Sequence, residues 1–115
     1  MLVGAFSSLL KRQDHFADHG HDMGAIDPID YENKARDFLS KPFTVDSSIE
    51  ERTRSNGDVV RYDKVTNEFA VATSSGTIKT YFKPMMRTQS PNGAPPQNTH
   101  SRSSNYQYFL DESST

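Results

Sequence analysis

The sequence contains no cysteine among its 115 residues. This absence excludes disulfide bonds, metal sites built on thiolates and a cysteine nucleophile. It leaves the cellular compartment open, although a protein delivered from one cell to another gains from needing no redox step.

Long apolar runs and the common nucleophile and nucleotide motifs are also missing. No stretch approaches the roughly 18–20 apolar residues that a membrane-spanning helix needs. Residues 1–12 are mildly apolar but carry their charges after the apolar run, unlike a secretion signal. Neither a Gly-x-Ser-x-Gly elbow nor a glycine-rich phosphate loop occurs. With only 33% hydrophobic residues, we expect one small domain that leaves part of the chain outside its core.

Negative and positive charges are unevenly distributed, although the net charge is only −2. Residues 13–51 hold ten acidic and three basic side chains, whereas residues 52–87 hold seven basic and three acidic ones. A local excess of this kind attracts a phosphate backbone even when the whole chain is slightly acidic. A solvated charged surface explains the same distribution, so charge alone leaves both interpretations open.

Residues 6–41 predict two helices. Apolar residues in the first part recur at helical spacing, and Gly20 and Gly24 break or bend that helix. Asp30 is a candidate N-cap for a second helix, which is expected to end near Lys41 and Pro42.

Residues 48–84 predict an antiparallel meander. Asn56-Gly57 is the strongest hairpin signal in the chain. In the last expected strand, strict alternation places Ile78, Thr80 and Phe82 on one face and the intervening residues on the other. The expected strands cover residues 49–54, 58–63, 68–73 and 77–83. The order predicts an α+β fold with two N-terminal helices packed on one face of a four-stranded sheet.

The end of the chain differs in composition from the rest. Residues 85–115 are rich in Ser, Asn, Pro and Gln, which predicts a flexible tail after a domain at residues 1–84. Within this tail, Tyr106–Leu110 is apolar enough to dock back as a short strand.

Three of the four histidines, His15, His19 and His21, lie within seven positions and carry the most conspicuous chemistry. His15 and His19 are four residues apart, so they share one face of a helix and suit a metal ion with His21 or Asp22 as a third ligand. Alternatively, one histidine transfers protons near neutral pH. Exposed histidines beside a helix end are the third interpretation.

A metal-free nuclease needs a base for the ribose 2′-hydroxyl, an acid for the leaving oxygen and donors for the phosphate. The run His19-Gly20-His21-Asp22-Met23-Gly24 resembles the His-x-x-Asp-aromatic-Gly segment of the colicin D-like ribonucleases. The segments that follow it resemble that family in the same order, up to a Gly-led strand at 76–83. Similar modules form the C-terminal toxins of contact-dependent inhibition and other polymorphic toxin systems.

The resemblance implies a metal-independent endoribonuclease with the barnase/EndoU/colicin/RelE-like fold and no cofactor. Its substrate would be tRNA, cut in the anticodon loop to leave a 2′,3′-cyclic phosphate. The family histidine corresponds to His19, its hydroxyl residue to Thr80 and its aromatic residue to Phe82. The lysines that precede the family histidine are replaced here by residues 16–18, so the phosphate charge must be met elsewhere.

The basic strands offer candidates for that charge. Lys83 and Arg54 are expected to stabilise the pentavalent phosphate, and Lys83 is counted with the catalytic residues. Arg52, Arg61 and Lys79 are further candidates for binding the substrate, together with Arg54 and Phe82.

Partners and location follow from the resemblance to toxins. Producing cells would need an immunity protein or antitoxin, and the domain would be secreted or delivered to act in the cytoplasm of a target cell. Two other functions remain open at this point. One is a non-enzymatic phage or plasmid module that binds a protein, and the other is a metal-dependent nuclease that uses His15, His19 and His21.

Overall fold

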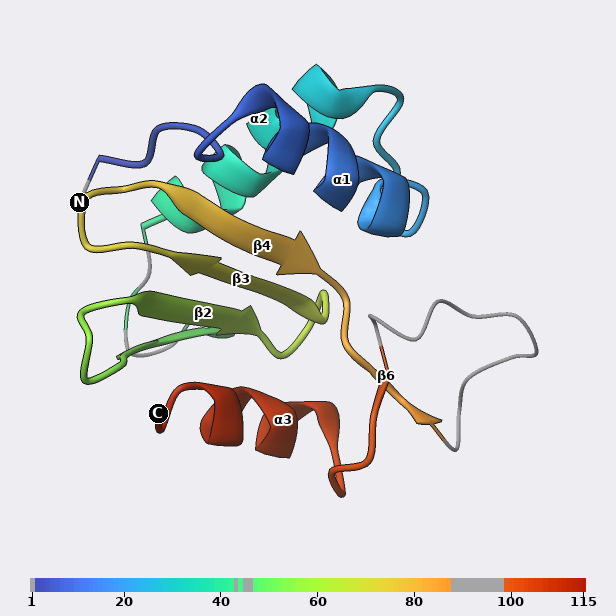
Figure 1. Ribbon diagram of the computed structural model, residues 1–115. Coiled ribbons are helices and arrows are strands. Elements are labelled where there is room, and N and C mark those ends of the chain that lie inside the picture. The colour runs from blue at the N-terminus through green and yellow to red at the C-terminus, as the bar shows by residue number, and fades with distance from the viewer. Residues whose placement is uncertain (1, 43, 45–46, 88–98) are drawn as a thin grey trace.

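The computed structural model describes residues 2–42, 44, 47–87 and 99–115 and has an α+β fold (Figure 1). The predicted class is therefore confirmed, together with the two N-terminal helices and the antiparallel meander. The elements in chain order are α1 Leu9–His19, α2 Pro28–Ser40, β1 Ile49–Thr53, β2 Val59–Asp63, β3 Glu68–Ala72, β4 Ile78–Phe82, β5 Met85–Met86, β6 Thr99–His100 and α3 Asn105–Glu112.

The helices begin at side chains that cap their free backbone N–H groups. Ser8 Oγ accepts from Lys11 N at 3.1 Å at the start of α1. For α2 the cap is Asp27, which accepts from Asp30 N at 2.7 Å and is followed by Pro28. The expected cap at Asp30 is thus three residues too late, because proline is well suited to the first helical position.

The four main strands form a sheet in the order β1-β2-β3-β4, each antiparallel to the next. Asn56-Gly57 makes the first turn as predicted, and the φ of 93° at Gly57 explains why glycine is needed there. The N-terminal segment lies along the outer edge of β4, with a parallel bridge between Phe6 and Ile78.

A β-bulge interrupts the pairing of β3 with β4. Val71 pairs with Thr80 and Ala72 pairs with Ile78, so Lys79 is an extra residue opposite no partner. Ile78 consequently packs under α1 and α2, whereas Phe82 packs on the other side of the sheet. The predicted common face for Ile78 and Phe82 is wrong, because alternation fails across a bulge.

The sheet has a hydrophobic core on each face, and the second core requires α3 (Figure 1). On the first face, side chains of the helices such as Tyr31 of α2 pack on sheet residues such as Ala70 of β3 and Tyr81 of β4. On the second face, α3 contributes the fully buried Phe109 to a cluster that also contains Val60, Tyr62, Phe69, Val71 and Phe82.

The C-terminal segment differs from the flexible tail that its composition predicts. Residues 99–115 form β6 and α3, and Tyr106–Leu110 is helical rather than a strand. Ser104 caps this helix, and four aromatic or aliphatic side chains in it contact the sheet-side cluster. Residues 88–98, with the Pro-rich part of the expected tail, lie outside the described residues.

No helix among the described residues is long and apolar enough to cross a membrane.

Candidate functional site

His19 is the last residue of α1 and is almost completely buried, with 4% of its surface exposed. Its imidazole stacks on the ring of Phe82 at the end of β4, with 5.0 Å between ring centroids and 22° between planes. The end of α1 lies beside the end of β4 in the fold (Figure 1). Two candidates that are 63 positions apart are therefore in direct contact.

Thr80 lies two residues before Phe82 on the same strand. Both pair with residues of the α3-side cluster, Thr80 with Val71 and Phe82 with Phe69, so they share a face of β4. Thr80 is half-buried on β4, which is the last strand of the four-stranded sheet. The N-terminal segment lies along the outer side of this strand. The histidine, hydroxyl and aromatic candidates thus lie along one short stretch of β4.

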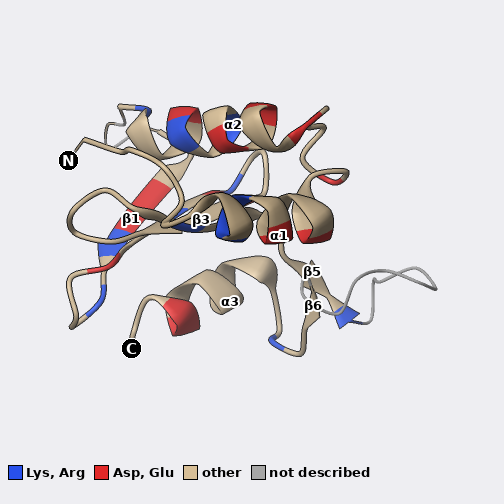
Figure 2. Ribbon diagram, turned by 45° about the horizontal axis from the view of Figure 1, so that its top comes forward, with Lys and Arg blue, Asp and Glu red and all other residues tan. Residues whose placement is uncertain are grey.

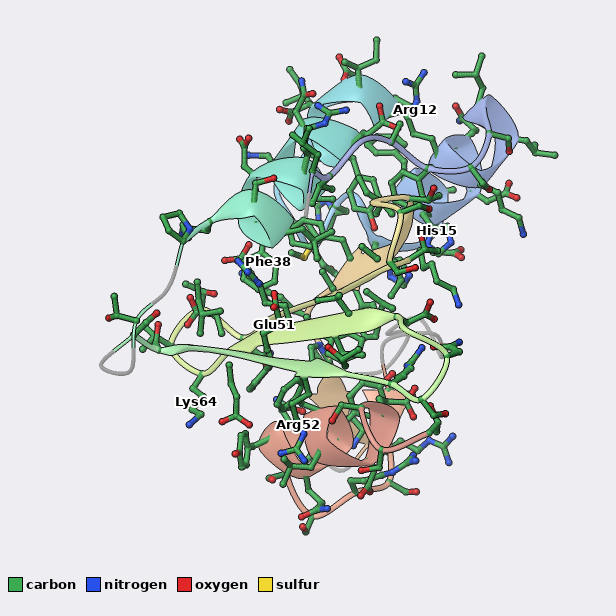
Figure 3. All side chains as sticks on the ribbon, turned by 90° about the vertical axis from the view of Figure 1, so that its left-hand side faces the viewer. Arg12, His15, Phe38, Glu51, Arg52 and Lys64 are labelled. Carbon is green, nitrogen blue, oxygen red and sulfur yellow. The ribbon has the colours of Figure 1, made fainter. Side chains whose placement is uncertain are left out.

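His15 lies one helical turn before His19 and is the more accessible of the two. The ring centroids of the two histidines are 5.9 Å apart, and His15 also stacks on Phe6 at 5.2 Å. Figure 3 shows His15 on the ribbon of α1. Its Nδ1 atom is buried and has no hydrogen-bond partner among the described residues.

A cavity of about 290 Å³ lies between the start of α1 and the start of β4, and His15 lines it. Lys11 from α1 and Lys79 from β4 supply positive charge to this cavity. Three hydroxyl groups, from Ser7, Thr73 and Thr77, also line it. Ammonium groups and hydroxyls are hydrogen-bond donors that an anionic group can accept from. Sequence reasoning noted His15 but not Lys11 or the hydroxyls, because only the fold brings β4 to α1.

The buried position of His15 changes its titration. Burial lowers the pKa of His15 below its usual value of about 6.5. The neighbouring His19 and Lys11 lower this pKa further, while Asp18 and Asp14 raise it. His15 is therefore neutral at pH 7, which is the form that accepts a proton.

This pKa predicts a loss of stability in acid. The unfolded chain binds a proton near pH 6.5, whereas the folded chain binds it only at lower pH, so stability is full above about 6.5 and falls as the pH drops through the folded pKa. One proton gives a slope of at most about 1.4 kcal/mol per pH unit. Urea unfolding at pH 7.5 and at several lower pH values measures the slope of the free energy of unfolding against pH. We expect His15→Gln to flatten this slope and His21→Gln, at an exposed position, to leave it unchanged. Equal slopes in wild type and His15→Gln would contradict the assignment.

Two of the predicted substrate-binding arginines have structural roles. Arg61 is 6% exposed and donates to the carbonyl oxygens of Phe38 and Lys41 at the end of α2, and to Glu51 at 2.7 Å. Arg54 donates to the carbonyl oxygen of Glu112 at 2.7 Å, at the end of α3. Each guanidinium thus donates to a carbonyl oxygen at a helix end and also pairs with a carboxylate, so both are committed to the fold.

Arg52 and Lys79 are more exposed but also have acidic partners. Arg52 lies 3.9 Å from Glu50 and is on the α3 side of the sheet, away from Phe38 (Figure 3). Lys79 Nζ lies 2.8 Å from Asp58 Oδ2, a contact that lowers the pKa of Asp58. Of these four cations, Lys79 is the one that lines the described cavity beside His15.

Lys83 does not join Thr80. It is exposed after the end of β4 and lines a different cavity, on the side of the sheet covered by α2. Both acidic and basic side chains occur along α1 and along α2 (Figure 2), so neither helix carries charge of a single sign.

The proposed metal site of His15, His19 and His21 does not form. No group of three His, Asp or Glu side chains with suitable geometry occurs in the described ranges. His21 lies after the end of α1 and is exposed, whereas His19 points into the core.

No protein-family model matches the sequence, and no curated protein is significantly similar to it.

Proposed function

We propose that this chain is a metal-independent endoribonuclease toxin domain of the colicin D-like type. The observation that supports this proposal most is the stacking of His19 on Phe82, with Thr80 two residues away on the same face of β4. The resemblance requires these three residues to lie close together, although His19 is in α1 and Thr80 and Phe82 are in β4, far along the sequence.

The proposed reaction is attack of a ribose 2′-hydroxyl on its own 3′-phosphate. The O2′–P bond forms, the bond from phosphorus to the 5′-oxygen breaks, and a 2′,3′-cyclic phosphate and a free 5′-hydroxyl result. His19 transfers the proton, Thr80 donates a hydrogen bond to the phosphate, and Phe82 holds the imidazole in place. We propose tRNA, cut in the anticodon loop, as the substrate.

The two histidines provide a pair for this proton transfer. Because burial keeps His15 neutral, it suits the role of base, and it lines the cavity that leads to solvent. His19 is more deeply buried, with 4% of its surface exposed, and its imidazole stacks on Phe82 of β4. Lys11, which forms no ion pair with a described residue, supplies positive charge to the phosphate at this cavity, whereas Lys79 lines it while paired with Asp58 at 2.8 Å.

A toxin of this kind has a protein partner. We propose that producing cells make an immunity protein or antitoxin that covers the site, and that the domain is delivered into the cytoplasm of a target cell. An acidic inhibitor surface would complement Lys11, Lys79 and the cations near β4.

Purified protein incubated with total tRNA tests this function. We expect discrete fragments on a denaturing gel, ends that carry a 2′,3′-cyclic phosphate, and unchanged cleavage in the presence of EDTA. Induced expression should arrest growth in parallel. Cleavage that EDTA abolishes would favour a metal-dependent nuclease. Intact tRNA and normal growth would favour a protein-binding module, a function for which the buried His19 is merely a core residue.

A further inference from the structure

We propose that a second cavity, lined by Lys34, Lys41 and Lys83, binds backbone phosphates of the RNA substrate outside the cleavage site. This inference rests on the proposed ribonuclease function, and it assigns the binding of the RNA chain to residues that the sequence did not single out as a group. We refer to this cavity, with its three lysines, as the lysine pocket.

The distribution of ion pairs is the first argument. Eight of the thirteen Lys and Arg residues form an ion pair with an Asp or Glu that the structure describes. Within the described ranges, the cations that form none are Lys11, Lys34, Lys41, Lys83 and Arg87. Three of these five line one cavity. A cation that no described carboxylate contacts keeps its charge more available for a ligand, although the charge of Lys41 also helps to lower the pKa of Asp63. Among the described residues, such cations thus gather at this cavity rather than along β1 and β2.

The shape and chemistry of the cavity are the second argument. It has a volume of about 370 Å³ and lies between α2, the turn that joins β2 to β3, and the end of β4. Tyr81 lines it, and the hydroxyl of Tyr81 donates to Glu68 Oε2. The other oxygen of Glu68 accepts from Thr66 Oγ1 at 2.7 Å. Both oxygens of the Glu68 carboxylate thus accept hydrogen bonds within the protein. Glu68 therefore competes less with an incoming phosphate for the lysine ammonium groups.

Asp37 is the other carboxylate in the lining, and it leaves the cavity with a net charge of about +1 if all its groups are ionised. Asp37 is exposed and forms no ion pair with a described residue, although it lies within one helical turn of Lys34 and Lys41. A carboxylate beside ammonium groups suits RNA better than a simple anion, because a ribose 2′-hydroxyl donates to it. The mixed lining therefore favours a ribonucleotide chain over an isolated phosphate ion.

The position relative to the proposed cleavage site is the third argument. Lys83 directly follows Phe82, whose ring stacks on His19, and the two residues leave the end of β4 in opposite directions. Met23, after the end of α1, also lines the lysine pocket. An RNA strand that passes the end of β4 thus has His19 on one side and Lys83 on the other. A chain with one phosphate at the cleavage site is placed to bind its neighbours in the lysine pocket.

Binding of an RNA that cannot be cleaved tests this inference separately from the activity. The probe is a single-stranded, fully 2′-O-methylated RNA of mixed sequence, which lacks the attacking hydroxyl. We expect the Lys34→Gln/Lys41→Gln/Lys83→Gln variant to bind it at least about tenfold more weakly at low salt. The slope of log K against log salt should fall by about two, since each phosphate contact on a single strand contributes about 0.7.

Lys64→Gln is the matched control. Lys64 is also exposed, but it pairs with Glu50 and lies over the ring of Tyr106 on the other side of the sheet, so its loss should leave the slope unchanged. The single variant Lys83→Gln should show about a third of the triple effect and guards against any change of fold in the triple variant. An unchanged affinity and slope in both pocket variants would overturn the inference. Binding to poly-glutamate but not to RNA would also overturn it and indicate an acidic protein partner.

The outcome is distinguishable from failure of the proposed function. A wild-type protein that does not cleave tRNA but binds the methylated RNA through the lysine pocket would retract the catalytic proposal alone. A protein that cleaves tRNA with unchanged binding in the pocket variants would retract the lysine pocket alone.

Discussion

Replacing His19 with alanine is expected to reduce tRNA cleavage by about 10²- to 10⁴-fold, the usual contribution of a proton-transferring side chain. Growth arrest on induction should disappear with it. His21→Ala is the matched control, because His21 lies two residues away and is exposed. We expect this control to cleave tRNA at the wild-type rate, as measured by initial rates with labelled tRNA.

The burial of His19 makes a second readout necessary. The imidazole packs on Phe82, so its loss also leaves a cavity and lowers stability. Rates must therefore be compared for protein that is folded at the assay temperature, as judged from urea unfolding. His19→Gln keeps much of the volume but cannot transfer a proton as an imidazole does, so it should restore stability but not cleavage. Full activity in His19→Gln would show that the residue only fills space, and the proton-transfer role would then be abandoned.

Replacing Phe109 with alanine is expected to destabilise the whole domain by about 3–5 kcal/mol. Phe109 is fully buried in α3, and its ring stacks at 5.6 Å on Tyr62 of β2. A small domain has about 5–15 kcal/mol of stability in total, so this change removes a large part of it. With a urea dependence of about 1–3 kcal/mol per molar, the unfolding midpoint should fall by at least about 1 M.

Val65→Ala is the control for this experiment. Val65 is 80% exposed in the turn between β2 and β3, and a surface change of this kind alters stability by about 0.5 kcal/mol or less. If Phe109→Ala left the midpoint where it was, α3 would not belong to the cooperative unit, and the domain would end near residue 84 as its composition predicts.

The sheet was predictable because its signals are local. Asn56-Gly57 specifies a tight hairpin, and the β-branched and aromatic residues on either side favour extended backbone. The helices α1 and α2 were predictable from apolar spacing, although the start of α2 required the choice of Asp27 over Asp30 as the cap.

The features that the sequence did not predict depend on contacts between distant residues. Tyr106–Leu110 is equally apolar in a strand or a helix, and the choice follows from the shape of the sheet face that it covers. No residue around Lys79 indicates a bulge from the sequence alone. Arg61 belongs to a basic strand by sequence, but its position opposite the end of α2 converts it into a partner for helix carbonyls.

The candidate site was predictable in part. The ordered motifs indicated that His19 should meet β4, and the two do meet at Phe82. Which cations are available to the substrate was harder to predict, because the sequence gives the number of positive charges but not their ion-pair partners. Arg52, Arg54, Arg61 and Lys79 all pair with acids, while Lys34 and Lys41, in a part of the chain rich in acid, remain unpaired with any described residue.

The bulge at Lys79 makes β4 the part of this fold that is least free to change in length. Ile78 serves the core under α1 and α2, whereas Phe82 serves the core under α3 and supports His19. Gain or loss of one residue between them would turn one of these side chains away from its core. The nearby turn at Ser74 and Ser75 is exposed and carries no such constraint. Variation in length among descendants of this chain should therefore gather in the turns and spare residues 78–82.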